Sequence, residues 1–140
     1  MEKRYISKCA DETIRIGEKL AKELKPGDVI AFYGELGSGK TTMIKGICKG
    51  FGIKKGVKSP SFVFLRIYKA SDVTLYHFDF YRLQGGSKLL DIDYDEYFYD
   101  TGIALVEWAD RVEEILPQKR YEIKILVKGE DKREICISHL

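Results

Sequence analysis

Hydrophobic positions in the first part of the chain predict a helix, a buried strand and a second helix. Apolar residues recur at helical spacing from Asp11 until Lys25-Pro26-Gly27 ends the pattern. Residues 29–33 form a continuous apolar run, which is typical of a strand buried on both faces of a parallel sheet. A glycine-rich turn follows, and apolar residues between Met43 and Phe51 then predict the second helix.

The sequence predicts one strand near the start of the chain and two more in its middle. Residues 4–7 predict a short edge strand. Residues 61–69 and 73–78 are rich in aromatic and β-branched residues and flank a short turn, so we expect them to pair as a hairpin. The acidic, aromatic stretch 89–99 that follows shows no clear pattern.

The last part of the chain predicts one more core strand and a second hairpin. Residues 103–106 are apolar, as a short core strand is, and residues 109–116 are expected to be helical as far as Pro117. Residues 121–127 and 133–139 flank a polar turn and predict a C-terminal β-hairpin. Strands interleaved with helices, followed by hairpins, indicate an α/β fold with a mixed sheet.

The size and composition of the chain favour one globular domain over residues 1–140. Of the 140 residues, 44% are hydrophobic and 33% are charged, and single domains cluster at about 100–150 residues. No apolar run approaches the ~18–20 residues of a membrane span, and the charged start of the chain does not resemble a signal peptide. The three cysteines form no metal-binding pattern. We therefore expect a cytoplasmic protein without a membrane partner.

The net charge of +2 hides two segments of opposite charge. Residues 40–58 contain six lysines and no acid, whereas residues 72–114 contain eleven acids and three bases. This separation favours a basic surface for an anion, with two ordinary solvated faces as the alternative.

Residues 34–41 carry the strongest chemical signal in the chain. Their sequence, Gly-Glu-Leu-Gly-Ser-Gly-Lys-Thr, fits the phosphate-binding pattern G-x-x-x-x-G-K-[ST] without a mismatch. In such a loop, backbone N–H groups and the N-terminus of the following helix bind phosphate oxygens. Lys40 would reach the β- and γ-phosphates, and the Thr41 hydroxyl would bind Mg²⁺. We therefore expect a P-loop NTPase-like fold: a mixed sheet with parallel core strands, flanking helices and a C-terminal β-hairpin.

A P-loop needs a carboxylate to complete its metal site, and two acids are candidates. Glu107 follows the apolar strand 103–106, and the carboxyl end of a core strand is where such an acid lies. Asp79 has a similar place after residues 73–78. For each of them, the alternative is an exposed acid at the end of a strand.

The other motifs limit the kind of NTPase. Guanine recognition by an N-K-x-D motif is excluded because the chain contains no Asn. A small-molecule kinase needs an acceptor pocket and usually a lid, and the length leaves little room for either, but a kinase stays the alternative. A binding module that has lost hydrolysis is a third possibility.

Four motifs, in this order, resemble those of the TsaE family, the P-loop ATPases of bacterial tRNA threonylcarbamoyladenosine synthesis. They are GELGSGKTT at residues 34–42, KSPSF at 58–62, HFDFYRL at 77–83 and VEW at 106–108. The P-loop alone is generic, whereas the combination is highly specific. Ser61 stands where the family usually has Thr, so the hydroxyl is kept and a methyl group is missing.

The resemblance implies roles for individual residues. Thr41 and Glu107 would be the Mg²⁺ ligands. Asp79 would order or activate the attacking water, with Lys40 as the second catalytic residue. Residues 59–62 would be a switch-like loop that senses the γ-phosphate. The residues implied to bind ATP are Leu36, Gly37, Ser38, Gly39, Lys40, Thr41, Thr42, Ser61, Trp108 and Arg133.

The resemblance also implies partners. The chain would be an ATPase subunit, weak on its own, that acts on a complex of the TsaB and TsaD proteins. That complex transfers threonylcarbamoyl to the adenosine beside the anticodon in tRNAs reading ANN codons, and ATP hydrolysis would reset it between turnovers. The chain would meet tRNA through the complex, and the lysines of residues 40–58 would face tRNA or a partner protein.

Three further polar residues have ordinary structural explanations. His77 lies on a predicted strand, where a buried packing histidine with satisfied hydrogen bonds is favoured over a catalyst. Arg82 and Arg111 are each a candidate arginine finger, but a surface salt bridge is favoured for both.

Overall fold

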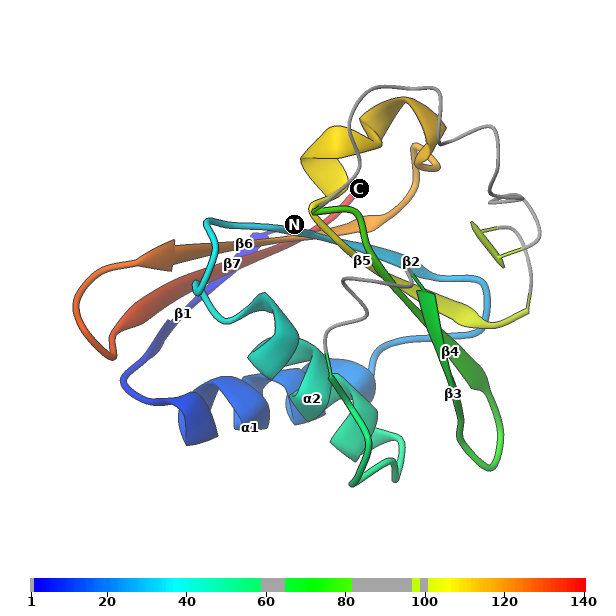
Figure 1. Ribbon diagram of the computed structural model, residues 1–140, viewed down its shortest axis with the longest axis horizontal. Helices are drawn as coiled ribbons and strands as arrows, with labels where there is room; N and C mark the ends of the chain where they lie inside the picture. The colour runs from blue at the N-terminus through cyan, green and yellow to red at the C-terminus, as the bar shows by residue number, and fades with distance from the viewer. Residues whose placement is uncertain (1, 59–64, 82–96, 99–100) are drawn as a thin grey trace.

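A mixed sheet of seven strands forms the centre of the structure, a computed structural model that describes residues 2–58, 65–81, 97–98 and 101–140 (Figure 1). The strand order across the sheet is β1-β7-β6-β2-β5-β4-β3. The strands are β1 (Glu2–Ser7), β2 (Val29–Tyr33), β3 (Leu65–Lys69), β4 (Thr74–Asp79), β5 (Ile103–Glu107), β6 (Tyr121–Val127) and β7 (Arg133–His139).

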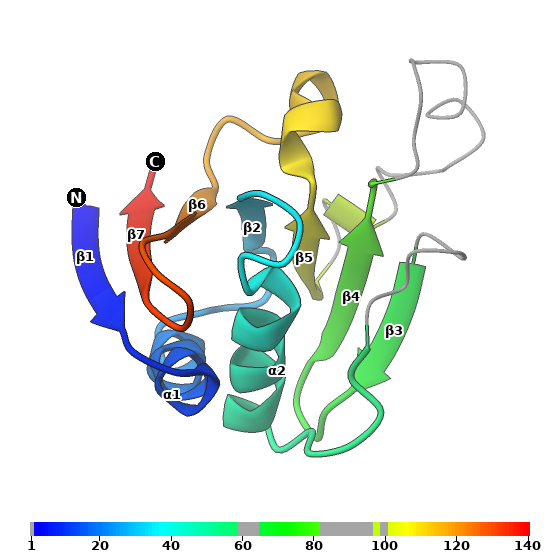
Figure 2. The same cartoon turned by 60° about the vertical axis from the view of Figure 1, so that its left-hand side comes forward.

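The sheet has a parallel core and antiparallel edges. β2 pairs in parallel with both β5 and β6, and β5 pairs in parallel with β4. The hairpins β3–β4 and β6–β7 are antiparallel, as is the pairing of β1 with β7. β1 and β3 therefore lie at opposite edges of the sheet (Figure 2). This arrangement confirms the predicted α/β mixed sheet with parallel core strands and a C-terminal β-hairpin; residues 61–64 of the first hairpin lie outside the described residues.

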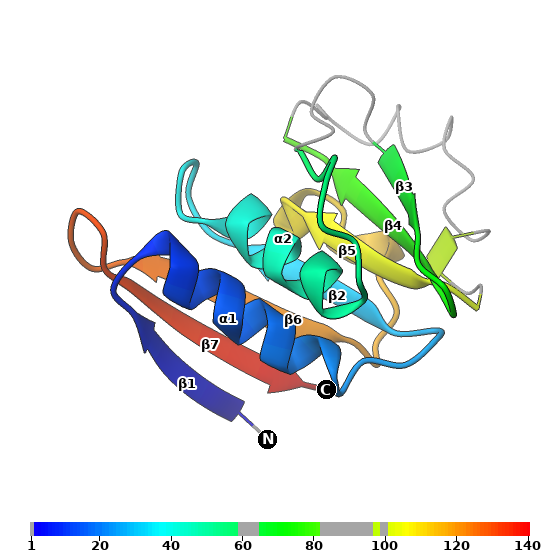
Figure 3. The same ribbon diagram turned by 90° about the horizontal axis from the view of Figure 1, so that it is seen from below.

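Helices cover the sheet on one face and short turns cover it on the other. α1 (Ala10–Ala21) and α2 (Lys40–Gly50) lie side by side on the same face (Figure 3). The opposite face packs against Phe98 and two 3₁₀ turns, η2 (Ala109–Arg111) and η3 (Glu113–Ile115). In the described part of the chain, no helix is long and apolar enough to cross a membrane.

Residues 109–116 form two 3₁₀ turns where the sequence predicts a helix. Val112 separates the turns with φ −136° and ψ 23°, and Leu116 is extended, with ψ 143°. Leu116 precedes Pro117, and a proline disfavours the helical conformation of the residue before it. The first helix also ends at Ala21, before the predicted stop at Lys25.

Successive side chains of β5 point to opposite faces of the sheet and belong to two separate layers of the core. This alternation continues to Glu107 at the end of the strand. Ile103 and Leu105 belong to the layer beneath the helices, whereas Ala104 and Val106 belong to the layer beneath the 3₁₀ turns. Because successive residues of a strand point to opposite faces, Glu107 turns towards the helices. The same rule places its side chain on the side where α2 begins.

Two glycines let α1 and α2 approach closely. A Cβ built at Gly17 would lie 2.5 Å from the backbone oxygen of Met43, and one built at Gly46 would collide with the backbone of Ile14. Backbone atoms inside a helix do not move aside easily, so any side chain here would push the helices apart. This contact therefore sets the distance between α1 and α2.

Replacing Gly46 with alanine should lower the free energy of unfolding by about 1–3 kcal/mol, the usual effect of overpacking, although alanine is the better helix former. Urea titration followed by circular dichroism measures this change. Lys45→Ala, at the exposed neighbouring position, is the control and should change stability by less than about 0.5 kcal/mol. A Gly46→Ala protein as stable as the wild type would contradict the close approach.

Candidate active site

Two neighbouring parallel strands end in carboxylates at the same edge of the sheet. β4 ends at Asp79 and β5 ends at Glu107, and these two residues are partners in the register. β2, on the other side of β5, ends at Tyr33, and α2 begins at Lys40 after a short loop. Because the carboxyl ends of parallel strands lie together, the predicted phosphate loop and both candidate acids share one edge.

The loop between β2 and α2 has backbone conformations that favour glycine. Gly37 has φ 80° and Gly39 has φ 109°, in the left-handed region where a side chain is strained. A Cβ built at either position would meet nothing within 4 Å, so conformation rather than crowding demands glycine there. The Ser38 N–H donates to the Glu35 carbonyl at 3.0 Å and closes a turn. The loop therefore curls tightly and leaves open space beside Gly37 and Gly39.

The Lys40 side chain is buried beside this loop, with 4% exposure. Its Nζ donates to the backbone carbonyls of Gly34 and Glu35, the second at 3.1 Å. Burial lowers the pKa of the Lys40 ammonium, while Glu107 and other nearby carboxylates oppose the shift. An anion bound beside Nζ would favour its charged form further.

Thr41 and Glu107 lie in direct contact. The Thr41 hydroxyl donates to the Glu107 carboxylate, with both oxygens at 3.0 Å. Glu107 Oε2 is also 2.6 Å from Nε2 of His77. Glu107 is 3% exposed and His77 is fully buried, so the group is largely withdrawn from water. The two residues predicted to bind Mg²⁺ thus bring hard oxygen donors together at one point.

The Asp79 carboxylate lies beside this pair, at 4% exposure. Asp79 Oδ1 accepts a hydrogen bond from the backbone N–H of Tyr81 at 2.9 Å. A carboxylate held by a backbone donor has a restricted orientation. Asp79 is therefore a fixed acceptor at the end of β4.

Aromatic rings lie next to Lys40. Trp108 follows β5 with φ 57°, a conformation uncommon for a residue with a side chain, and its ring centroid is 4.0 Å from Lys40 Nζ. The Tyr81 and Trp108 ring centroids are 4.8 Å apart. The guanidinium of Arg111 lies 5.5 Å from the centroid of the same Trp108 ring. Arg111 thus packs over aromatic rings beside the site, and the other candidate finger, Arg82, lies outside the described residues.

A cavity of about 370 Å³ joins these groups. It is lined by the loop, the start of α2, both strand-end acids and two aromatic side chains. The lining residues are Leu36, Gly37, Ser38, Gly39, Lys40, Thr41, Thr42, Asp79, Tyr81, Glu107 and Trp108. The structure therefore brings together every predicted site residue except Ser61, which lies outside the described residues, and Arg133.

Arg133 contacts the loop rather than this cavity. Its Nε donates to the Ser38 carbonyl at 2.9 Å, and one terminal nitrogen donates to the Gly37 carbonyl at 3.5 Å. The other terminal nitrogen donates to carbonyls of its own hairpin turn. Arg133 was predicted to bind ATP, and the structure shows its guanidinium supporting the loop that would do so.

Phosphate groups and Mg²⁺ fit the donors of this cavity. Ser38 Oγ is buried and has no hydrogen-bond partner within the described residues, and an unpaired buried hydroxyl is costly. The open space beside Gly37 and Gly39 lets an oxyanion approach the backbone. Within the described residues, no group of three or more His, Cys, Asp or Glu could hold a metal. Mg²⁺, however, commonly takes one or two carboxylates together with substrate phosphates.

The sequence motifs predict no site role for Tyr81 or His77. Tyr81 lines the cavity, and His77 contacts Glu107. His77 is buried and hydrogen-bonded, as predicted for a packing histidine, but its partner is the candidate metal ligand. The available signal was the alternation along β4, which places His77 and Asp79 on the same face.

Comparisons with known proteins identify the family. The sequence model of the family described as "Threonylcarbamoyl adenosine biosynthesis protein TsaE" matches residues 7–135. The tRNA threonylcarbamoyladenosine biosynthesis protein TsaE of Bacillus subtilis (strain 168) is 46% identical over 128 residues, which cover 91% of this chain and 80% of that protein. The protein of the same name from Treponema pallidum (strain Nichols) is 36% identical over 135 residues, 96% and 99% of the two chains.

A solved structure shares the fold. The crystal structure of Bacillus subtilis YdiB matches with a TM-score of 0.86 at 37% sequence identity. The match covers 99% of this chain and 86% of the other. Sequence and structure thus agree with the resemblance of the four motifs, and the chain belongs to the TsaE family of tRNA threonylcarbamoyladenosine biosynthesis proteins.

Proposed function

We propose that the chain is the ATP-binding, Mg²⁺-dependent ATP-hydrolysing subunit required for threonylcarbamoyl modification of tRNA. The observation that carries this proposal is the hydrogen bond from the Thr41 hydroxyl to the Glu107 carboxylate. It joins a residue of the phosphate loop to a strand-end acid in a cavity that Lys40 and Asp79 also line. Phosphoryl transfer to water needs this combination of positioning and charge neutralisation.

Residues 36–42 would hold the phosphates of ATP. Backbone N–H groups of the loop and the N-terminus of α2 would meet phosphate oxygens. Lys40 Nζ, which donates to backbone carbonyls, would donate instead to the β- and γ-phosphates. Such charge-assisted hydrogen bonds are stronger than bonds to neutral carbonyls.

Thr41 and Glu107 would bind Mg²⁺. The Glu107 carboxylate supplies negative charge and the Thr41 hydroxyl supplies a neutral oxygen. The two groups are hydrogen-bonded to each other, so both lie close enough to share one ion. Bound there, the ion would neutralise charge on the phosphates. The phosphate oxygens themselves would complete its ligand set.

Asp79 would order or activate the attacking water. Its carboxylate lines the cavity and is held by the Tyr81 N–H, and a fixed carboxylate can orient a water or accept its proton. Trp108 would report nucleotide binding because its ring lies over Lys40. Ser61 would sense the γ-phosphate from the predicted switch-like loop, and Arg133 would support the loop.

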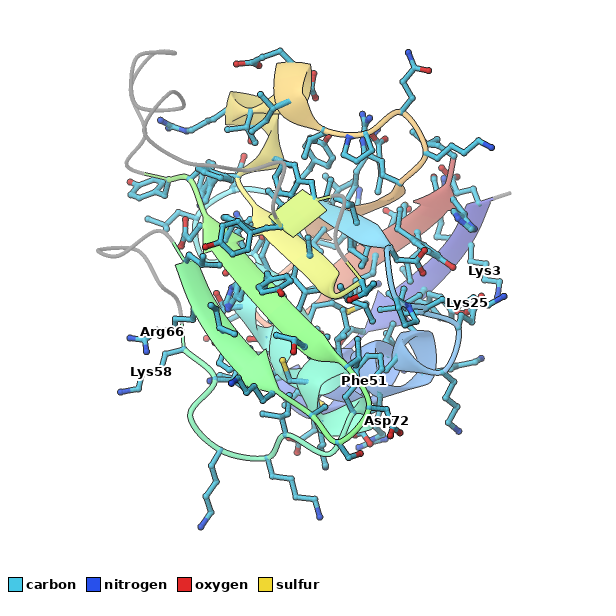
Figure 4. The ribbon with its side chains drawn as sticks, turned by 90° about the vertical axis from the view of Figure 1, so that its right-hand side faces the viewer. Lys3, Lys25, Phe51, Lys58, Arg66 and Asp72 are labelled. Carbon is cyan, nitrogen blue, oxygen red and sulfur yellow. The ribbon has the colours of Figure 1, made fainter. Side chains whose placement is uncertain are left out.

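The subunit would act in the cytoplasm on a complex of TsaB and TsaD and reset it between turnovers of tRNA modification. Membership of a tRNA threonylcarbamoyladenosine family supports this pathway. The four family motifs lie between residues 34 and 108, and no segment of the sequence has a pattern that indicates a separate substrate domain. Lys58 and Arg66, whose side chains both project from the same side of the molecule in Figure 4, would belong to the basic surface that faces tRNA or a partner.

Replacing Lys40 with alanine should weaken ATP binding roughly 10- to 100-fold, because a hydrogen bond to a charged group contributes about 1.5–3 kcal/mol. Hydrolysis should fall with it. Titration of Trp108 fluorescence with ATP measures the affinity, and Lys45→Ala, an exposed lysine one turn further along α2, is the control. Unchanged affinity and hydrolysis in Lys40→Ala would remove the loop from the proposal.

Replacing Asp79 with asparagine should reduce ATP hydrolysis about 10²- to 10⁴-fold, the range for a general acid or base. ATP affinity should stay nearly the same, since the amide keeps an oxygen for the Tyr81 N–H. Phosphate release in the presence of the partner proteins gives the rate. Asp72→Asn, on the exposed turn before β4, is the matched control. Full activity of Asp79→Asn would exclude a catalytic role for this carboxylate.

The ATPase rate of the purified chain, measured alone and with TsaB, TsaD and tRNA, tests the proposed function as a whole. We expect slow hydrolysis by the chain alone and clear stimulation by the partners. Stimulation by a metabolite, with labelled phosphate appearing in it, would indicate a kinase. ATP binding without turnover under every condition would leave only a binding module. Either result would contradict the proposal.

A further inference from the structure

Three polar side chains form a diagonal row across β3, β4 and β5, on the face of the sheet that carries the helices. In the register, Tyr68 pairs with Leu75, and His77 pairs with Leu105. His77 is therefore two residues beyond the partner of Tyr68, and Glu107 is two residues beyond the partner of His77. Diagonal neighbours on one face lie within reach of long or aromatic side chains.

Hydrogen bonds connect the three side chains of the row along its whole length. Glu107 Oε2 lies 2.6 Å from Nε2 of His77, and Nδ1 of His77 lies 3.1 Å from the Tyr68 hydroxyl. The Tyr68 hydroxyl donates to the backbone carbonyl of Lys58 at 3.3 Å. At the other end, the Glu107 carboxylate accepts the hydrogen bond of Thr41.

Burial makes this row a rigid support. His77 is fully buried and Tyr68 is 8% exposed, so neither group exchanges its partners easily for water. Burial also raises the pKa of the Tyr68 hydroxyl, which therefore keeps its proton. The row ends on a main-chain carbonyl, beside the edge strand β3 (Figure 4), and that anchor does not depend on the side chain of Lys58.

His77 and Tyr68 do not contact the reacting groups themselves. Neither residue lines the cavity formed by the phosphate loop and the strand-end acids. Within the described residues, their hydrogen-bonded contact with the site runs through Glu107. A carboxylate that is held by a second, buried partner presents its oxygens in one orientation, and such partners of metal ligands typically contribute 10- to 100-fold in metal affinity or activity.

We propose that His77 and Tyr68 are positioning residues for metal binding: they hold the Glu107 carboxylate facing Thr41 and anchor it to the main chain at Lys58. This inference rests on the proposed function, because it takes Glu107 as a ligand of Mg²⁺. The histidine of the sequence HFDFYRL would thereby have a role although it does not line the cavity, because its imidazole contacts Glu107 from the side of the sheet.

The test is the affinity for Mn²⁺, as a probe for Mg²⁺, in the presence of a non-hydrolysable ATP analogue, measured by electron paramagnetic resonance. His77→Leu should weaken Mn²⁺ binding about 10- to 100-fold, and Tyr68→Phe about 10-fold. His77→Gln should recover most of the loss, because its amide can donate near the position of Nε2. Affinity for the nucleotide without metal, followed by Trp108 fluorescence, should stay within about twofold of the wild type in all three.

Tyr121→Phe is the matched control, since Tyr121 is a buried tyrosine of similar exposure, 6%, on β6. Wild-type Mn²⁺ affinity in both His77→Leu and Tyr68→Phe would overturn the inference. If the variants lose as much nucleotide affinity in the absence of metal as they lose Mn²⁺ affinity, the inference would also be overturned. Such a result would indicate that His77 and Tyr68 have a general structural role. If circular dichroism shows that His77→Leu does not fold, the Mn²⁺ affinities of Tyr68→Phe and Tyr121→Phe are compared instead. Equal affinities of these two variants would then overturn the inference. A wild-type protein that binds no Mn²⁺ with the nucleotide would instead overturn the proposed function.

Discussion

The parallel pairing of β4 with β5 determines where the candidate active site lies. Its register sets Asp79 directly beside Glu107, and a shift of one residue would turn one of these strands over and separate the two acids. The pairing of β2 with β5 then brings the phosphate loop to the same edge, where Thr41 meets Glu107. The close approach of α1 and α2 fixes how these two helices pack against each other on one face of the sheet (Figure 3).

Burial determines how strongly the charged groups of the site act on each other. Lys40, Asp79 and Glu107 are each 4% exposed or less, so water screens their charges poorly. The lowered pKa of Lys40 records the cost of its burial, and the carboxylates around it offset part of that cost. A nucleotide with its divalent cation would bring a negative and a positive partner to these groups at once, which makes the site responsive to both.

The sequence predicted the elements that follow local rules. The G-x-x-x-x-G-K-[ST] pattern located the loop because its glycines need special backbone angles, and the apolar run of β2 showed a strand buried on both faces. Contacts that depend on the pairing register of the strands could not be predicted from the sequence. The bond of His77 to Glu107 joins residues 30 positions apart, and the support of the loop by Arg133 joins residues 95 apart; no local pattern encodes either. In residues 109–116, Pro117 disfavours a helical conformation of Leu116, and the buried Val112 separates the two 3₁₀ turns.

Thr41 and Glu107 are proposed to form the metal site of an ATPase. A crystal structure of the chain with Mn²⁺ and a non-hydrolysable ATP analogue would locate the ion through its anomalous signal. We expect one anomalous peak at about 2.0–2.3 Å from the Thr41 hydroxyl and a Glu107 oxygen, a distance typical of such ligands, with the phosphates in the loop. A peak away from both residues, or a nucleotide outside the loop, would contradict it.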